Sequence, residues 1–180
     1  MRLQYEDFVK TALNALNESG VEYVIIGGLA AIFYGRPRTS LDVDIIVSVK
    51  IENLEDFHKF LENKGFDIDY NDLLSSLKEK SHASIFLSEY PFRIDLKGVY
   101  DSLDRASMQN RRREKIFGVT AWIESPEDLV IAKLCYGSQQ DIEDIRAVLK
   151  RQKLNMKYLE KRSKEEGVLA KLKNVLSDKT

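Results

Sequence analysis

Residues 41–49 place two acidic side chains within an otherwise apolar stretch, and this segment constrains the fold more than any other. Its apolar positions alternate, at Leu41, Val43, Ile45 and Val47. Because successive side chains of a strand point to opposite faces, the period of two predicts a strand with Asp42 and Asp44 on one face. Like charges side by side on a strand are costly without a cation. The pair therefore predicts a cation site or, alternatively, a solvated strand face.

The remaining segments predict a mixed α/β protein. Apolar spacing predicts helices at residues 5–18, 29–34, 52–64, 126–136, 141–152, 156–166 and 168–177, and strands at 21–26, 41–49, 82–87, 92–99 and 115–123. Ser125 followed by Pro126 is a strong helix start, because serine caps a helix and proline suits its first turn. Residues 70–80 and 101–113 fit neither period. The order predicts an α/β (α+β) fold, a mixed β-sheet flanked by helices with a helical C-terminal part.

Composition excludes several classes of protein. A chain of 180 residues that is 43% hydrophobic and 32% charged predicts a soluble globular domain. The single cysteine, Cys135, and two distant histidines, His58 and His82, exclude a disulfide framework and a clustered Cys/His metal site. No apolar run approaches the roughly 18–20 residues that span a bilayer, and the N-terminal residues do not form a secretory signal. We therefore expect a cytoplasmic protein that does not insert into a membrane.

A third carboxylate and a glycine pair extend the pattern around Asp42 and Asp44. Asp95 lies in residues 92–97, where apolar residues again alternate with charged ones, so it completes a three-carboxylate site if the two strands are neighbours. All-oxygen ligands of this kind suit Mg²⁺, and two such ions can clamp the attacking and leaving oxygens of a phosphoryl transfer. Gly27 and Gly28 join a strand to a helix, where backbone N–H groups are available to an anion. A simple tight turn is the alternative interpretation of the glycines.

In this order, the motifs resemble those of the nucleotidyltransferase fold of the polymerase-beta superfamily. The glycine pair is followed by Arg-x-Ser-x-Asp-x-Asp over residues 38–44 and then by a later strand aspartate. Residues 25–38 and 125–145 are similar to segments of the abortive-infection (AbiEii-like) and related bacterial nucleotidyltransferases. The resemblance covers about residues 20–150. It implies a nucleotidyltransferase-like α/β core at residues 1–124, with a helical region at residues 125–180 packed on it.

The resemblance implies a Mg²⁺- or Mn²⁺-dependent transfer of a nucleoside monophosphate from an NTP such as ATP, with release of pyrophosphate. It assigns catalysis and metal binding to Asp42, Asp44 and Asp95, with Asp95 also helping to deprotonate the acceptor. It assigns nucleotide binding to Gly27, Gly28, Arg38, Ser40 and Lys133. The acceptor is a hydroxyl of RNA (a tRNA end, for example), of a protein or of a small molecule. A toxin–antitoxin role with an antitoxin partner is also implied.

Three acidic and basic side chains near residue 140 have alternative interpretations. Lys133 is the only charge in residues 129–136, and its ammonium needs a carboxylate or phosphate partner unless it extends to water. The resemblance favours a contact with the triphosphate or with an active-site carboxylate. Asp141 is predicted to cap a helix, with Asp144 as its third-position partner, and Asp144 also remains a candidate site residue.

A non-catalytic role is the alternative to the enzyme. Residues 150–180 carry a net charge of +6 and the first 149 residues a net charge of −7. Such a basic tail suits a phosphate-bearing partner, but a solvated pair of helices is the simpler interpretation. The alternative function is therefore a nucleotidyltransferase-fold module that binds RNA or a protein partner. Arg111, Arg112 and Arg113 are predicted to lie in a solvated loop.

Overall fold

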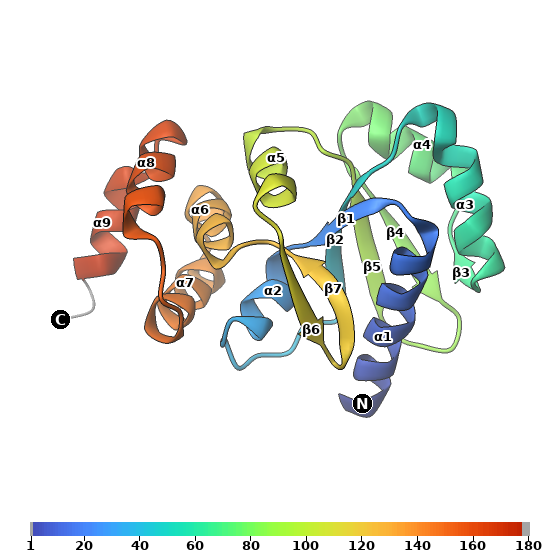
Figure 1. Ribbon diagram of the computed structural model, residues 1–180, viewed down its shortest axis with the longest axis horizontal. Coiled ribbons are helices and arrows are strands. Elements are labelled where there is room, and N and C mark those ends of the chain that lie inside the picture. The colour runs from blue at the N-terminus through green and yellow to red at the C-terminus, as the bar shows by residue number, and fades with distance from the viewer. Residues whose placement is uncertain (1, 178–180) are drawn as a thin grey trace.

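The computed structural model describes residues 2–177 and confirms the predicted mixed α/β architecture (Figure 1). The strands are β1 (Glu22–Ile25), β2 (Asp42–Ser48), β3 (Phe66–Asp67), β4 (His82–Leu87), β5 (Arg93–Lys97), β6 (Arg112–Ile116) and β7 (Val119–Ile123). The helices are α1 (Arg2–Ser19), α2 (Gly27–Phe33), the short 3₁₀ helix η1 (Ile51–Asn53), α3 (Leu54–Asn63), α4 (Tyr70–Glu79), α5 (Ser102–Gln109), α6 (Pro126–Tyr136), α7 (Gln139–Arg151), α8 (Met156–Glu165) and α9 (Leu169–Ser177). Within residues 2–177, seven strands form one sheet in the order β3-β4-β5-β2-β1-β7-β6.

The register of the central strands places the predicted carboxylates together. β2 is parallel to β5, and Asp44 lies opposite Asp95 while Asp42 lies opposite Arg93. β4 and β5 are antiparallel neighbours, with Ser84 opposite Asp95. Because side chains alternate along a strand, the three acidic side chains share one face of the sheet.

The opposite face of β2 supplies the main core. Val43, Ile45 and Val47 are fully buried there with Phe8 and Leu13 of α1. On the acidic face, Ile46 packs instead with Val24 and with Met108 of α5. The acidic residues therefore occupy the beginning of β2, and apolar packing begins two residues further along the same face.

The single strand predicted at residues 115–123 is wrong. Residues 112–123 form the β6–β7 hairpin, in which Ile116 pairs with Val119. The turn between them needs two left-handed residues, Phe117 (φ 48°) and Gly118 (φ 88°). Glycine adopts this conformation without strain, so Gly118 was the signal for the turn. The hairpin also corrects the loop predicted for the arginines, because β6 begins at Arg112.

Two helices fill the segments that the sequence pattern left unassigned. α4 begins after Asp69, whose carboxylate accepts the N–H groups of Asn71 and Asp72. α5 begins after Asp101, whose carboxylate accepts the N–H of Asp104. Each aspartate caps its helix by satisfying N–H groups that have no partner within the helix.

The C-terminal helices pack beside the acidic face. α6 starts as predicted, with the Ser125 side chain accepting the Asp128 N–H, and it contacts α2, α5, α7 and α8. Figure 1 shows α8 and α9 at the opposite end of the molecule from α3 and α4. The division at residues 124 and 125 remains a prediction. Over residues 2–177, no helix is long and apolar enough to cross a membrane.

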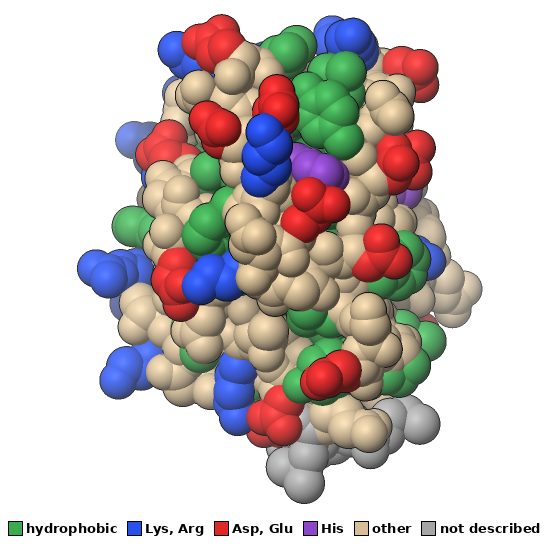
Figure 2. Space-filling view, turned by 90° about the vertical axis from the view of Figure 1, so that its right-hand side faces the viewer, with side chains coloured by type: hydrophobic (Ala, Val, Ile, Leu, Met, Phe, Trp, Pro, Cys, Tyr) green, Lys and Arg blue, Asp and Glu red, His purple; other side chains and the backbone are tan. Residues whose placement is uncertain are grey.

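The end of the molecule that carries α3 and α4 has a mixed charge. Figure 2 shows acidic and basic side chains dispersed over this end. Several are paired there, including Lys59 with Glu55 at 2.6 Å and Lys64 with Glu18 of α1. This end of the molecule therefore lacks the single-sign surface that typically attracts a nucleic acid.

Candidate active site

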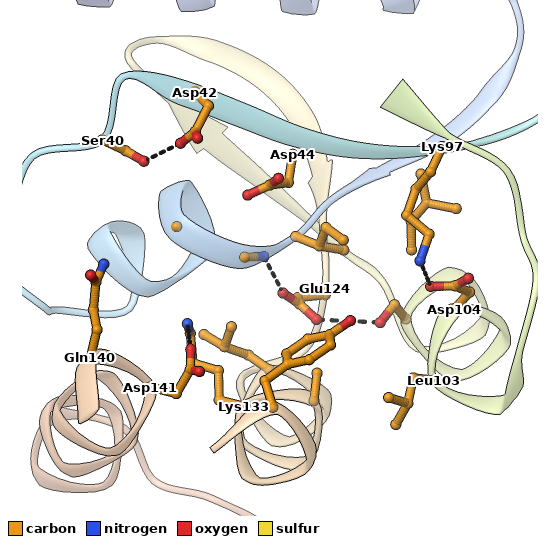
Figure 3. Close-up of a pocket in the computed structure, with 18 of the residues that line it drawn as sticks. Ser40, Asp42, Asp44, Lys97, Leu103, Asp104, Glu124, Lys133, Gln140 and Asp141 are labelled. Atoms are coloured by element: carbon orange, nitrogen blue, oxygen red, sulfur yellow. Dashed lines mark hydrogen bonds and ion pairs between the residues drawn. The ribbon is translucent and has the colours of Figure 1, made fainter. Parts of the chain in front are cut away.

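A cavity of about 490 Å³ opens over the acidic face of the sheet (Figure 3). Its walls come from the β1–α2 turn, β2, α5, α6 and the beginning of α7. Of the predicted site residues, seven line it, namely Gly27, Gly28, Arg38, Ser40, Asp42, Asp44 and Lys133. Asp95 does not line it. The fold therefore brings most of the predicted residues to one cavity although they are spread over more than 100 positions of the chain.

Asp42 and Asp44 enter the cavity from neighbouring positions of β2. The Ser40 hydroxyl donates a 2.8 Å hydrogen bond to Asp42 Oδ1. Burial raises the pKa of Asp44, and the negative charges of Asp42 and Asp95 raise it further, while the Gly28 N–H lowers it. The Asp44 carboxylate is thus poorly solvated and repelled by its neighbours, a condition that a bound cation relieves.

Asp95 lies beside Asp44 on the same face, but other groups hold its carboxylate. It is 9% exposed, and its two oxygens accept from Ser84 Oγ at 2.7 Å and from Arg93 Nε at 3.0 Å. Arg93 also lies 3.5 Å from Asp42 Oδ2, so the guanidinium bridges two of the three predicted carboxylates. In the described part of the chain, no three His, Cys, Asp or Glu side chains are arranged to hold a metal ion.

The remaining pair, Asp42 and Asp44, fits a divalent cation in its chemistry. Mg²⁺ prefers oxygen ligands and commonly binds through one or two carboxylates together with substrate phosphates. Both carboxylates line the cavity, and Asp44 has the raised pKa of a carboxylate that lacks charge compensation. Two carboxylates on one strand face therefore suit Mg²⁺ or Mn²⁺ without requiring a third.

The turn at Gly27 and Gly28 has no side chains of its own, and side chains of the site pack directly against its backbone. Gly27 has a left-handed backbone (φ 64°), and a Cβ there would lie 2.5 Å from Asp44 Oδ2. A Cβ on Gly28 would lie 2.7 Å from Arg38 Nη2 and 2.8 Å from Ser40 Oγ. A side chain at either position would displace a predicted site residue, and at Gly27 it would also strain the left-handed backbone.

We expect Gly27→Ala to be more destabilising than Gly20→Ala, a matched control. Gly20 has a similar φ of 69° but nothing within 4 Å of its Cβ position, so both variants share the backbone strain. Only Gly27→Ala adds the clash with Asp44, which we expect to cost about 1–3 kcal/mol more in the free energy of unfolding. Urea denaturation measures both. Equal losses for the two variants would show that Asp44 does not press against the turn.

A buried ionic cluster joins α6 and α7 to the segment before β2. Asp144 is 0% exposed and lies 2.8 Å from Arg36 Nη1, 3.4 Å from Arg38 Nε and 2.7 Å from Lys133 Nζ. Three cations thus surround one buried carboxylate, which satisfies the requirement that a buried charge be paired. Arg38 and Lys133 also line the cavity, so Asp144 fixes the two predicted nucleotide-binding cations in place.

The contacts of Lys133 exclude the interpretation in which it extends to water, and those of Asp141 show its position at the start of α7. Lys133 Nζ lies 2.8 Å from Asp141 Oδ1 as well as close to Asp144, so its partners are carboxylates and its side chain does not extend to water. The prediction of Asp141 as a helix cap is wrong. Ser138 is the cap, and Asp141 is the third residue of a capping box in which each side chain accepts from the other's backbone.

Glu124 is a buried acid of this site that the sequence pattern did not single out. It is 2% exposed, and its carboxylate accepts the Gly27 N–H at 2.8 Å and lies 3.3 Å from Ser107 Oγ. Burial raises its pKa to about 8. The sequence signal that could have identified Glu124 is its position, because it is an acidic residue directly between the apolar strand at residues 119–123 and the helix cap Ser125.

The opposite end of the cavity carries a second ion pair. Lys97 Nζ lies 2.8 Å from Asp104 Oδ1, with Leu103 nearby (Figure 3). Tyr136 also lines the cavity. Tyr136 is 69% exposed and thus offers an aromatic ring at the rim. At this end the charges of Lys97 and Asp104 neutralise each other, whereas at the other end the carboxylates of Asp42 and Asp44 lie side by side.

A glycine turn leading to an Asp-x-Asp strand of a mixed sheet, with buried cations across the cavity, is typical of nucleotidyltransferases. Residues 7–178 match the family described as "Nucleotidyltransferase of unknown function (DUF6036)", and the chain belongs to this family. The protein is therefore a nucleotidyltransferase of that family. No curated protein sequence matches the chain.

Solved structures with the same fold include antibiotic adenylyltransferases. ANT(2'')-Ia, an antibiotic-resistance factor, is 15% identical with a TM-score of 0.65, over 97% of each chain. The lincosamide antibiotic adenylyltransferase LnuA is 16% identical with a TM-score of 0.57, over 82% of this chain and 97% of its own. JHP933 from Helicobacter pylori is 18% identical with a TM-score of 0.56, over 91% of this chain and 72% of its own. At these identities the likeness establishes the fold.

Proposed function

We propose that this protein transfers a nucleoside monophosphate from a Mg²⁺-bound NTP, such as ATP, to a hydroxyl acceptor. The supporting observation is that Asp42 and Asp44 share one cavity with the glycine turn and with Arg38 and Lys133. Carboxylates for a divalent cation and fixed cations for phosphate oxygens are the two elements that phosphoryl-type transfer requires.

In this mechanism, the acceptor oxygen forms a bond to the α-phosphorus as the bond from that phosphorus to the bridging oxygen breaks, and pyrophosphate leaves. Mg²⁺ or Mn²⁺, when bound, neutralises charge on the phosphate oxygens. Asp42 and Asp44 hold the cation, while Arg38 and Lys133 contribute positive charge on the triphosphate side. We retain Asp95 as the third carboxylate and proton acceptor in the proposal because it lies directly beside Asp44. In this role it exchanges its contacts with Ser84 and Arg93 for the cation and the acceptor hydroxyl.

Among acceptors, we place a small-molecule hydroxyl ahead of a tRNA end or a protein side chain. A cavity of about 490 Å³ is of small-molecule size. Two structures of the same fold support this order, because ANT(2'')-Ia was solved with adenylyl-2''-tobramycin and LnuA with lincomycin. The toxin–antitoxin role, an antitoxin partner and closeness to the abortive-infection enzymes rest on the sequence motifs alone.

The alternative, a non-catalytic module that binds RNA or a partner protein through its basic C-terminal helices, gains no support from the contacts there. Arg162 pairs with Glu165 and Glu166, each at 2.9 Å. Lys171 donates to the Leu134 carbonyl at 3.0 Å. These basic groups have internal partners, as expected of a solvated helix pair.

Incubation with labelled NTPs, Mg²⁺ and a panel of acceptors tests the proposal. The panel contains aminoglycosides, lincosamides, total RNA and cell protein, and mass spectrometry identifies the modified product. We expect Mg²⁺-dependent label transfer that is lost in the Asp42→Asn/Asp44→Asn variant. Transfer that persists in this variant would refute the assignment of the site.

Measuring the unfolding temperature with added ligands distinguishes the proposed enzyme from the alternative, a non-catalytic binding module. A ligand that binds the folded state raises the unfolding temperature. We expect ATP to stabilise the wild-type protein only when Mg²⁺ is present. Stabilisation by RNA alone, unaffected by the two aspartate substitutions, would favour the binding module instead.

A further inference from the structure

Glu124 connects three parts of the chain that meet beneath the acidic face. β7 runs parallel to β1, with Ile123 beside Ile25, so Glu124 is the next residue along and its N–H donates to the Ile25 carbonyl at 2.9 Å. This places its side chain beneath the turn that follows β1. The Glu124 carboxylate accepts the Gly27 N–H at 2.8 Å, a contact that Figure 3 shows as a dashed line.

The same residue also fastens the other end of α2. The Tyr34 hydroxyl, from the residue that follows α2, donates to the Glu124 carbonyl at 2.7 Å and is buried. Glu124 thus holds the start of α2 through its side chain and the end of α2 through its main chain. Both contacts span about 90 or more positions of sequence, so they fix α2 against the sheet.

We propose that Glu124 is a positioning residue for Asp44, an inference that rests on the proposed metal-binding role of Asp44. Glu124 fixes the left-handed Gly27, which lies so close to Asp44 that a Cβ on Gly27 would be 2.5 Å from Asp44 Oδ2. The next residue, Gly28, stabilises the Asp44 carboxylate through its N–H. A turn that is free to rotate would remove both the wall and the hydrogen-bond donor that orient this carboxylate.

The Glu124 carboxyl group accepts two hydrogen bonds in this arrangement. Its Oε1 accepts from the Gly27 N–H at 2.8 Å, and its Oε2 accepts from Ser107 Oγ at 3.3 Å. Glutamine keeps the contact with Gly27, because its carbonyl oxygen accepts that N–H, and its amide donates to Ser107 Oγ once the hydroxyl turns to accept. Methionine has a similar length and fills the site, but it offers only a weak acceptor to the Gly27 N–H.

The test compares Glu124→Gln and Glu124→Met by two measurements that do not require turnover. Hydrogen exchange reports the Gly27 amide, and titration with Mn²⁺ alone reports the acidic pair. We expect Glu124→Met to lose about tenfold in both amide protection and Mn²⁺ affinity, since one lost buried hydrogen bond is worth about a factor of ten. We expect Glu124→Gln to stay within about twofold of wild type in both.

Glu127→Met is the matched control for the loss of a buried glutamate. Glu127 binds Arg112 at 2.7 Å and the Asn155 N–H at 2.9 Å, and neither partner belongs to the cavity. We expect this variant to lower the unfolding temperature and to leave Gly27 protection and Mn²⁺ affinity unchanged. Equal losses in the two methionine variants, or unchanged values in Glu124→Met, would overturn the proposal.

The measurements also separate this inference from the proposed function. A wild-type protein that binds no Mn²⁺ and transfers no nucleotide would remove the role of Asp44 and with it the positioning role of Glu124. Gly27 protection that still falls in Glu124→Met would then show that Glu124 fixes the turn without a catalytic purpose. Mn²⁺ binding in wild type that survives Glu124→Met overturns the inference while leaving the proposed function intact.

Discussion

Asp44→Asn is expected to lower nucleotidyl transfer by on the order of a thousandfold, because removal of a charged group that supports phosphoryl-type transfer has effects of this size. The same change is expected to raise the free energy of unfolding, since it removes a buried charge that lies near Asp42 and Asp95. An activity assay and urea denaturation measure the two quantities.

Asp67→Asn, on the exposed side of β3, is the control for Asp44→Asn. We expect it to leave both transfer and stability close to the wild-type values. An Asp44→Asn variant that loses activity because it is less stable than wild type would contradict this account, since the fold does not depend on the Asp44 charge. A variant that keeps full activity would remove Asp44 from the mechanism.

The stability of the protein is expected to fall as the pH rises from about 4.5 to about 8, through the titration of Glu124. Burial raises the pKa of Glu124 from 4.5 to about 8, with the Asp128 charge adding to the increase and Lys133 opposing it. In this window the folded state holds a proton that the unfolded state has released. This contribution is therefore fully present below pH 4.5 and lost above pH 8, and it is on the order of 4–5 kcal/mol.

Glu124→Gln isolates this contribution from the other titrating groups. The glutamine cannot ionise, so the difference in unfolding free energy between wild type and variant is expected to change across the same window. Urea denaturation at pH 5, 6, 7 and 8 measures it. A difference that stays constant from pH 5 to pH 8 would show that Glu124 is ionised in the folded protein.

The central strand and its acids were predictable from sequence because the alternation is a local property. Residues 41–49 and 92–97 each show a period of two, which correctly predicted two strands with their acids on the polar face, and the structure supplies the pairing of these strands. The glycine turn was predictable for the same reason. That Arg93 holds Asp95 was also open to prediction, because the two residues are two positions apart on one strand face.

The partners of Lys133 were not predictable because they depend on packing between helices. Its need for an anion followed from the apolar sequence around it, but the identity of its carboxylate partners, Asp141 and Asp144, depends on where α7 packs against α6. Glu124 was missed for a related reason. Its partner Gly27 is 97 positions away, and only the parallel pairing of β7 with β1 brings the two together.

The central claim, that Asp42 and Asp44 hold a divalent cation beside the glycine turn, is tested most directly by calorimetric titration of Mn²⁺ with a non-hydrolysable ATP analogue present. We predict saturable binding to the wild-type protein and at least about a tenfold weaker affinity for Asp42→Asn and for Asp44→Asn, with unchanged circular dichroism. Equal Mn²⁺ affinity in all three proteins would contradict the account.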